Sequence, residues 1–213
     1  MNFIITAIAV YVVAFLLGSI PCGVIIGKTF YGVDPRSGGS HSIGATNSSR
    51  MMGLKGGIIV MVCDMLKGVI AVVIARVCIM ALGLEGAQAD ALLMGSAFFG
   101  IMGHCYSPWL HFKGGKGIST GFGVLVVASP PIGIGILVVF AIFAVATRIV
   151  SVGSMAAAIS VTVFALVFHW GSVPFFVFGL LCTIQVLFAH RANIGRLVRG
   201  EEPKFTGKKT KGE

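Results

Sequence analysis

Long apolar runs alternate with short polar loops along almost the whole chain, and many of these loops are rich in glycine. A helix that crosses a bilayer needs about 20 mainly apolar residues. Seven runs are candidates for such helices, and the fourth of them is short: residues 3–26, 57–82, 91 to about 108, 118–129, 132–146, 152–168 and 174–189. The pattern therefore predicts an all-α membrane protein with seven transmembrane helices, in which residues 118–129 cross the bilayer either fully or in part.

The composition agrees with this pattern, because 56% of the 213 residues are hydrophobic and only 11% are charged. Soluble domains carry about 25% charged residues, so an ordinary soluble domain is excluded. We expect one membrane domain over residues 1–213, ending in a basic cytoplasmic tail from about residue 200. The formal net charge is +9, but the basic residues lie in short loops beside apolar runs, so we expect no nucleic-acid partner.

The distribution of lysine and arginine predicts the orientation. Loops that flank the membrane on the cytoplasmic side carry an excess of these residues. With the N-terminus outside, the inner segments hold Lys28, Arg36, Arg50, Lys55, Lys113, Lys116, Arg148, Arg191, Arg196, Arg199, Lys204, Lys208, Lys209 and Lys211. The outer segments, around residues 83–90, 130–131 and 169–173, hold none. We therefore predict an outer N-terminus and a cytoplasmic C-terminus.

The first apolar run and the five cysteines have simple interpretations. The run starts at Phe3 with no charged segment before it, so we expect a retained helix rather than a cleaved signal peptide. No two cysteines form a C-x-x-C pair, and all lie in or beside apolar runs. We interpret them as small buried hydrophobic residues and expect no metal site and no cofactor.

The segment HFKGGKGISTGFG, residues 111–123, carries two lysines among glycines. It fails the P-loop pattern G-x-x-x-x-G-K-[ST], because Gly117 follows Lys116 and Leu110 precedes Gly115 by five. Glycines still let backbone N–H groups approach an anion, and a helix starting near Ile118 would add its dipole. Lys113 and Lys116 could serve only as membrane anchors, but the glycines favour an anion site.

Three other inner segments carry candidate chemistry. Hydroxyl, amide and guanidinium groups crowd the segment SHSIGATNSSR, which suits recognition of a phosphate and a polyol, although such residues also cap helices. Arg148 is followed by serines at positions 151 and 154, which either line a cavity or pack helices closely. His190 and Asn193 are three apart and share a helical face where the last run leaves the membrane.

The remaining polar residues indicate structure rather than catalysis. Asp64 and Lys67, three apart in the second run, are interpreted as an internal ion pair that fixes the bundle. His104 and His169 are expected to be hydrogen-bonded histidines. The inner loops before the tail hold a single carboxylate, Asp34, so they offer no pair of carboxylates for acid–base chemistry. A cationic, hydrogen-bonding site of this kind suits a substrate that is already activated, because the protein then only orients anions and stabilises charge.

Several motifs occur in an order that resembles one known family. They are GSIPCGVIIGK, GGSHSIGATNSSR, CDMLKG, GH, FKGGKGISTGFG and HRANIGRL, from Gly18 to Arg196. The chain is similar to the bacterial acyl-phosphate-dependent glycerol-3-phosphate acyltransferases, integral membrane enzymes of phospholipid synthesis. The resemblance implies seven membrane helices and a cytoplasm-facing site in the inner membrane. It implies transfer of an acyl group from acyl phosphate to the 1-hydroxyl of glycerol 3-phosphate, giving lysophosphatidic acid and phosphate, with no direct acyl-CoA or acyl-carrier-protein donor.

The resemblance also assigns residues to the site. It implies catalytic roles for Thr46, Asn47, Lys116 and His190, and substrate or phosphate binding by Ser40, Ser42, Arg50, Lys113, Gly114, Gly115, Gly117, Arg148, Ser151, Ser154 and Asn193. The family commonly has asparagine where this chain has Ser42, and glycine where it has His41. Ser42 can still hydrogen-bond, but it offers one hydroxyl where an amide would offer more.

An acyl phosphate is a mixed anhydride with a good leaving group, so a protein nucleophile is unnecessary. The glycine loop would hold the phosphate of either the acyl donor or glycerol 3-phosphate, and the acyl chain would lie between apolar helices. The hydroxyl proton would pass to a phosphate oxygen of the substrate or to His190. The alternative function is transport of a phosphorylated solute, but this predicts polar, glycine-broken segments on both sides of the membrane.

Overall fold

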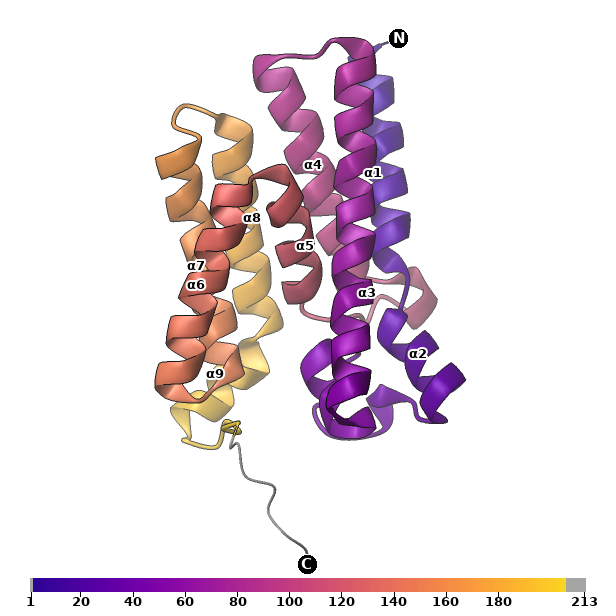
Figure 1. The fold of residues 1–213 in the computed structure, drawn as a ribbon, viewed down its shortest axis with the longest axis vertical. Coiled ribbons are helices and arrows are strands. Elements are labelled where there is room, and N and C mark those ends of the chain that lie inside the picture. Colours follow the sequence, from indigo (N-terminus) through magenta and orange to yellow (C-terminus); the bar gives the residue numbers. More distant parts are fainter. Residues whose placement is uncertain (1, 206–213) are drawn as a thin grey trace, which may run out of the picture.

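The computed structural model describes residues 2–205, and this part of the chain is helical without any β-strand (Figure 1). Its α-helices are α1 (Phe3–Ser19), α2 (Cys22–Tyr31), α3 (Ala45–Leu82), α4 (Gly86–Cys105), α5 (Ile118–Ala128), α6 (Pro130–Thr147), α7 (Val150–Phe168), α8 (Val173–Ala189) and α9 (Arg191–Val198). Two short 3₁₀ turns, η1 (Pro35–Ser37) and η2 (Pro108–Leu110), lie in the loops. The all-α prediction is confirmed, whereas most of the predicted basic tail, residues 206–213, lies outside the described residues.

The long helices run side by side, and the start of α1 lies at the opposite end of the bundle from α9 (Figure 1). Helices α1, α3 and α4 form one group, and α6, α7 and α8 form another. The short helix α5 lies between the groups and packs against α3, α4 and α6. A site between the groups is therefore lined by residues that are far apart in the sequence.

The core and the surface are both apolar. Val72, Leu92, Val124 and Ile132 are completely buried in one continuous cluster that joins both groups of helices. Large apolar side chains also cover the outside, including Ile4, Leu66, Ile134, Val163 and Ile184. An apolar exterior of this extent suits lipid rather than water.

Length and composition qualify four helical segments as membrane spans on their own: Phe3–Tyr31, Ala45–Leu82, Pro130–Thr147 and Val150–Phe168. A fifth span would join α8 to α9, which are bent by 59° relative to each other. Helix α5 has 11 residues and is about 16 Å long, compared with about 30 Å for the hydrocarbon layer. Seven spans therefore remain a prediction.

Two helices depart from the predicted runs. The first run breaks at Ile20 and Pro21, because proline has no N–H with which to continue α1. Helix α3 begins at Ala45, well before the predicted start at residue 57, and bends at Gly53, whose φ of 75° is outside the helical region. The sequence analysis placed residues 45–56 in the loop between the first two runs, but they form the first turns of α3.

The C-terminal end of α5 is fixed by hydrogen bonds. Arg76 donates to the carbonyl oxygens of Val127 (2.7 Å) and Ala128 (3.2 Å), the last carbonyls of α5. A cation at a helix C-terminus is electrostatically favourable. Ser129 Oγ lies 2.8 Å from Nε2 of His169, in the turn between α7 and α8. The C-terminus of α5 is therefore joined to that turn through the side chain of His169.

Candidate active site

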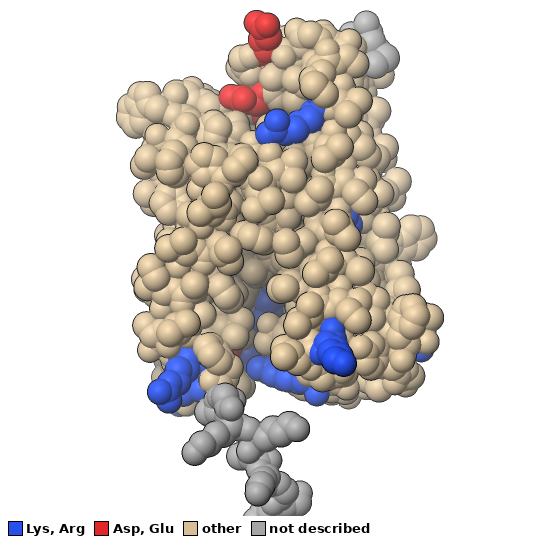
Figure 2. Space-filling view, viewed as in Figure 1, with Lys and Arg blue, Asp and Glu red and all other residues tan. Residues whose placement is uncertain are grey.

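A polar cavity of about 530 Å³ lies between the two groups of helices. The space-filling view shows a hollow on this face with basic side chains inside it, and basic side chains gather at the same end of the molecule (Figure 2). The cavity brings together all four inner segments singled out in the sequence. Their lining residues are Ser40, Ser42, Thr46, Asn47, Arg50, Lys116, Gly117, Ser151, Ser154, His190 and Asn193. Four predicted site residues are not in its wall: Lys113, Gly114, Gly115 and Arg148.

Three helices begin at the cavity. First-turn residues of α3 (Ala45, Thr46), α5 (Ile118) and α7 (Val150, Ser151) all line it. The N–H groups in the first turn of a helix have no partner within the helix, and the dipole gives that end partial positive charge. The sequence predicted this arrangement only for α5. The convergence of three such ends makes the cavity favourable for anions.

Asn47 organises the loop before α3. It is almost fully buried, and its Nδ2 donates to the carbonyl oxygens of Pro35 (2.6 Å), Ser42 (2.9 Å) and Gly38 (3.2 Å). Its Oδ1 accepts the backbone N–H of Ser40 at 2.7 Å. The amide predicted to be catalytic is thus occupied by loop contacts, which hold the segment from Gly38 to Ser42 against the first turn of α3.

The glycine loop differs from the expected anion cradle. The N–H groups of Gly114 and Gly115 donate to the carbonyl oxygens of Cys105 and His104, each at 3.0 Å, so they are not available to an anion. A Cβ on Gly115 would meet the His104 ring, so only glycine lets the loop pack this closely on the end of α4. Gly117 has a φ of 82° and turns the chain into α5. The glycines therefore position Lys116, which points into the cavity.

Lys116 Nζ donates to Asn193 Oδ1 at 2.5 Å. Burial lowers the pKa of Lys116 to about 8, with the cations Arg196 and Arg50 acting in the same direction and the carboxylate of Glu202 opposing them. The lysine is thus a desolvated cation among like charges. An anion that enters the cavity gains a strong electrostatic interaction there.

His190 is also in the wall and is 2% exposed. Its Nδ1 lies 2.8 Å from the carbonyl oxygen of Val186, which can only accept, so Nδ1 carries the proton and Nε2 does not. Burial, reinforced by the charge of Lys116, lowers the pKa of His190 to about 4. The side chain is therefore neutral at physiological pH, with an acceptor nitrogen.

Glu202 and Arg196 were missed by the sequence analysis. The Glu202 carboxylate accepts hydrogen bonds from Asn193 Nδ2 (2.6 Å), Ser151 Oγ (2.7 Å) and Arg196 Nε (2.7 Å). These contacts hold the pKa of Glu202 below its usual value although burial acts in the opposite direction. Arg196 follows Asn193 by three residues in α9, so the spacing that linked His190 with Asn193 could have included it.

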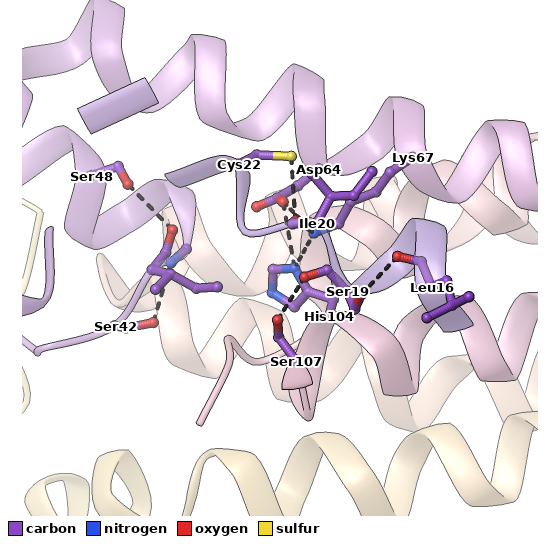
Figure 3. A network of polar contacts seen from close by, with 12 residues as sticks. Leu16, Ser19, Ile20, Cys22, Ser42, Ser48, Asp64, Lys67, His104 and Ser107 are labelled. Atoms are coloured by element: carbon purple, nitrogen blue, oxygen red, sulfur yellow. Dashed lines mark hydrogen bonds and ion pairs between the residues drawn. The ribbon is translucent and has the colours of Figure 1, made fainter. Parts of the chain in front are cut away.

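The predicted ion pair of Asp64 and Lys67 is confirmed, and His104 joins it (Figure 3). Lys67 Nζ lies 2.8 Å from Asp64 Oδ1 and 2.9 Å from both His104 Nδ1 and the carbonyl oxygen of Ile20. That carbonyl lies at the break between α1 and α2, where it also accepts the N–H of Cys22 at 3.0 Å. The buried ammonium of Lys67 therefore joins the break between α1 and α2 to α4. Asp64 and His104 form part of the cavity wall.

An apolar groove of about 310 Å³ adjoins the cavity. Helices α3 to α8 contribute to it, and it shares six lining residues with the cavity: Met61, Gly117, Ile118, Ser119, Phe140 and Ser154. A ligand with a charged head and a hydrocarbon chain can place one part in each space. Among residues 2–205, no group of His, Cys, Asp or Glu is arranged to hold a metal ion.

Comparison with known proteins identifies the family of a chain with this polar cavity and apolar groove. The glycerol-3-phosphate acyltransferase family model matches residues 8–200. The chain belongs to this family. It is 39% identical to the glycerol-3-phosphate acyltransferase of Synechococcus elongatus over 202 residues, covering 95% of this chain and 96% of the relative. The enzyme of Geobacillus kaustophilus is 38% identical over 195 residues, covering 92% and 94%.

Solved structures of a glycerol-3-phosphate acyltransferase have the same fold. The crystal structure of PlsY (YgiH), an integral membrane enzyme, in its glycerol 3-phosphate form has a TM-score of 0.85 and 34% identity, covering 94% of this chain and 96% of that one. The lysophosphatidic acid form has a TM-score of 0.83 and 33% identity, covering the same shares. The predicted family, the membrane location and the acylation of glycerol 3-phosphate are confirmed, and the transporter alternative has no support.

Proposed function

We propose that the chain transfers an acyl group from acyl phosphate to the 1-hydroxyl of glycerol 3-phosphate in the polar cavity. The site would face the cytoplasm in the inner membrane of a bacterium. The observation that carries the proposal is the convergence of three helix N-termini with Arg50, Lys116 and Arg196 on one cavity that opens into an apolar groove. Both substrates carry phosphate, and one also carries a long hydrocarbon chain.

The groove supports the assignment of the acyl chain. Its walls are almost entirely apolar side chains, and the residues that it shares with the cavity mark where the acyl carbonyl would lie. Ser119 and Ser154 are the hydroxyl-bearing residues at this junction. The cations and the first turns of α3, α5 and α7 would hold the two phosphates on the polar side.

The chemistry needs no covalent enzyme intermediate. The 1-hydroxyl oxygen would form a bond to the acyl carbon, the bond from that carbon to the phosphate oxygen would break, and inorganic phosphate would leave. Lys116 would stabilise the charge on the leaving phosphate, and Thr46, at the start of α3, would add hydrogen-bond donors. The hydroxyl proton would go to a substrate phosphate oxygen or to Nε2 of His190, which is unprotonated.

The roles of the other predicted residues follow from their places. Ser40, Ser42, Ser154 and Asn193 would bind substrate oxygens from the cavity wall, and Ser151, whose proton goes to Glu202, would accept a hydrogen bond from a substrate hydroxyl. Gly117 would shape the turn before α5, and Gly114 and Gly115 would support Lys116 through their contacts with α4. Lys113 and Arg148, outside the wall, would attract anionic substrates to the entrance.

The test uses the purified protein with palmitoyl phosphate and glycerol 3-phosphate, and measures lysophosphatidic acid and phosphate. We expect Lys116→Ala to lower kcat/KM by about 10²–10³-fold, as loss of a preorganised donor does. The matched control is Lys55→Ala, because Lys55 is exposed on α3 and is not in the cavity wall. Product formed only from palmitoyl-CoA would contradict the proposed donor, and equal loss in both variants would contradict the role of Lys116.

A further inference from the structure

The carboxylate of Glu202 is an unexpected group in a cavity that must accept phosphate. It follows α9, and its side chain is 6% exposed. Ser151 from α7, together with Asn193 and Arg196 from α9, donates to it at 2.6–2.7 Å. The backbone beyond it is also attached to the site, since the N–H of Phe205 donates to the carbonyl oxygen of Arg148 at 2.8 Å. The carboxylate is therefore held in one place by three side chains.

The contacts of Glu202 determine which way the Asn193 amide faces. An ionised carboxylate only accepts hydrogen bonds and an ammonium only donates them. The Nδ2 group of Asn193 must therefore face Glu202, and its Oδ1 is left for Lys116. The order Glu202, Asn193, Lys116 has one consistent arrangement of donors and acceptors. Reversing the amide would place Oδ1 against the Glu202 carboxylate, where two acceptors would meet, and Nδ2 against the Lys116 ammonium, where two donors would meet.

Glu202 is also the anion that balances the charges around Lys116. The charged and titratable groups that act on Lys116 or share the cavity wall with it come from every neighbouring element: Arg50 and Asp64 of α3, His104 of α4, His190 after α8, Arg196 of α9, and Glu202 and Lys204 beyond α9. Arg50 and Arg196 disfavour the charged form of Lys116, whereas Glu202 favours it. Asp64 is already paired with Lys67.

We propose that Glu202 is a positioning residue of the acyl-transfer site: it fixes the orientation of Asn193 and thereby holds Lys116 in the cavity as a cation. This inference rests on the proposed function, in which Lys116 binds phosphate. Glu202 itself touches neither the reacting hydroxyl nor the leaving phosphate. Its contribution is to aim a lysine that would otherwise be repelled by two nearby guanidinium groups.

The first experiment measures kcat/KM against pH for the wild type and for Glu202→Gln, with each substrate varied in turn. Lys116 must be protonated to bind phosphate, so activity falls as pH rises through its pKa. Removing the carboxylate makes the ammonium less favourable, so the fall should move to lower pH, by roughly one unit. The matched control is Glu201→Gln, because Glu201 is exposed, pairs with Arg199 and loses the same charge. For Glu201→Gln, the alkaline limb of the pH profile, where kcat/KM falls as pH rises, should stay at the wild-type pH.

The second experiment exchanges the two groups in Asn193→Asp/Glu202→Gln. Lys116 can then donate to the new carboxylate, which also accepts from the new amide, so the total charge and the alternation of donors and acceptors are kept. We expect the alkaline limb of the remaining activity to return to the wild-type pH or above, although kcat/KM itself falls because Asn193 also lines the substrate cavity. This variant keeps the test decisive if Glu202→Gln does not yield folded protein.

The outcomes separate this inference from the proposed function. If wild-type protein makes no lysophosphatidic acid from palmitoyl phosphate, or if Lys116→Ala is fully active, the proposed function fails. If those results are as expected but Glu202→Gln lowers kcat without moving the alkaline limb, Glu202 only holds the fold together and the inference is overturned. An exchange variant whose alkaline limb stays at the pH found for Glu202→Gln would overturn it as well.

Discussion

His190 is the side chain whose protonation can be argued most directly. Its pKa is lowered to about 4 by burial and by Lys116, so the imidazole stays neutral from pH 6 to pH 9. Stability and activity that depend on the neutral ring are therefore complete above the ordinary histidine pKa and are lost as pH falls towards 4. Above pH 6, His190 should contribute no ionisation to the rate profile.

We expect His190→Ala to lower kcat by about 100-fold, because an unprotonated Nε2 in the cavity wall can accept the hydroxyl proton. Steady-state kinetics with palmitoyl phosphate would measure the loss. His111→Asn is the control, since His111 is exposed outside the cavity and asparagine tolerates its positive φ of 52°. A near-normal turnover of His190→Ala would instead assign the proton to a phosphate oxygen of the substrate.

At the residue scale, sequence patterns found the charged and hydroxyl groups but not their partners. Arg50, Lys116, His190 and Asn193 were predicted from type and spacing, and all line the cavity. The structural role of Asn47 could not be predicted, because its amide bonds to carbonyls up to 12 residues away in an irregular loop. Such contacts depend on the path of the backbone, which residue spacing does not encode.

At the scale of elements, close packing of α1 on α4 depends on glycines. A Cβ on Gly103 would meet Phe15 O and Ser19 N of α1, whereas the atoms nearest to a Cβ on Gly100 would be 3.6 Å and 3.8 Å away. Gly103→Ala should therefore force the helices apart and destabilise the protein by about 1–3 kcal/mol. Gly100→Ala is the matched control in the same helix, and its better helix propensity should leave stability unchanged or slightly raised.

Thermal unfolding in detergent would compare the two glycine variants with the wild type. A clearly lower Tm for Gly103→Ala alone is the expected result. Equal Tm values for both variants would mean that α1 and α4 can separate without cost, contrary to the packing described.

The helix starts show why elements were only partly predictable. Apolar periodicity located the membrane-buried parts of α3, α6, α7 and α8 to within a few residues. It did not reveal that α3 extends back to Ala45, because polar residues line that end to face a cavity rather than lipid. The break at Pro21 was also missed, since the flanking residues are apolar on both sides and only the loss of one N–H marks it.

At the scale of the whole molecule, the charges are distributed unevenly along the bundle axis. Most of the basic side chains visible in Figure 2 gather at the end where the cavity lies, and the acidic side chains plainly visible there lie at the other end, beside a further basic side chain. The distribution that predicted the orientation from loops is therefore also a property of the folded surface. The cytoplasmic leaflet is rich in anionic lipid, which favours the basic end on that side.

The position of α5 decides whether the two ends of the chain lie on opposite sides of the membrane. Five helices, α4 to α8, separate Glu85 from Glu201, so these residues are on opposite sides only if α5 counts as a full crossing. We predict that it does, because Ser129, at the C-terminus of α5, lies within hydrogen-bond distance of His169, which follows α7. A membrane-impermeant maleimide should therefore label Glu85→Cys in intact cells, in a background without the native cysteines, and label Glu201→Cys only after lysis. Labelling of both in intact cells, or of neither, would mean that α5 is re-entrant and that the chain has an even number of crossings.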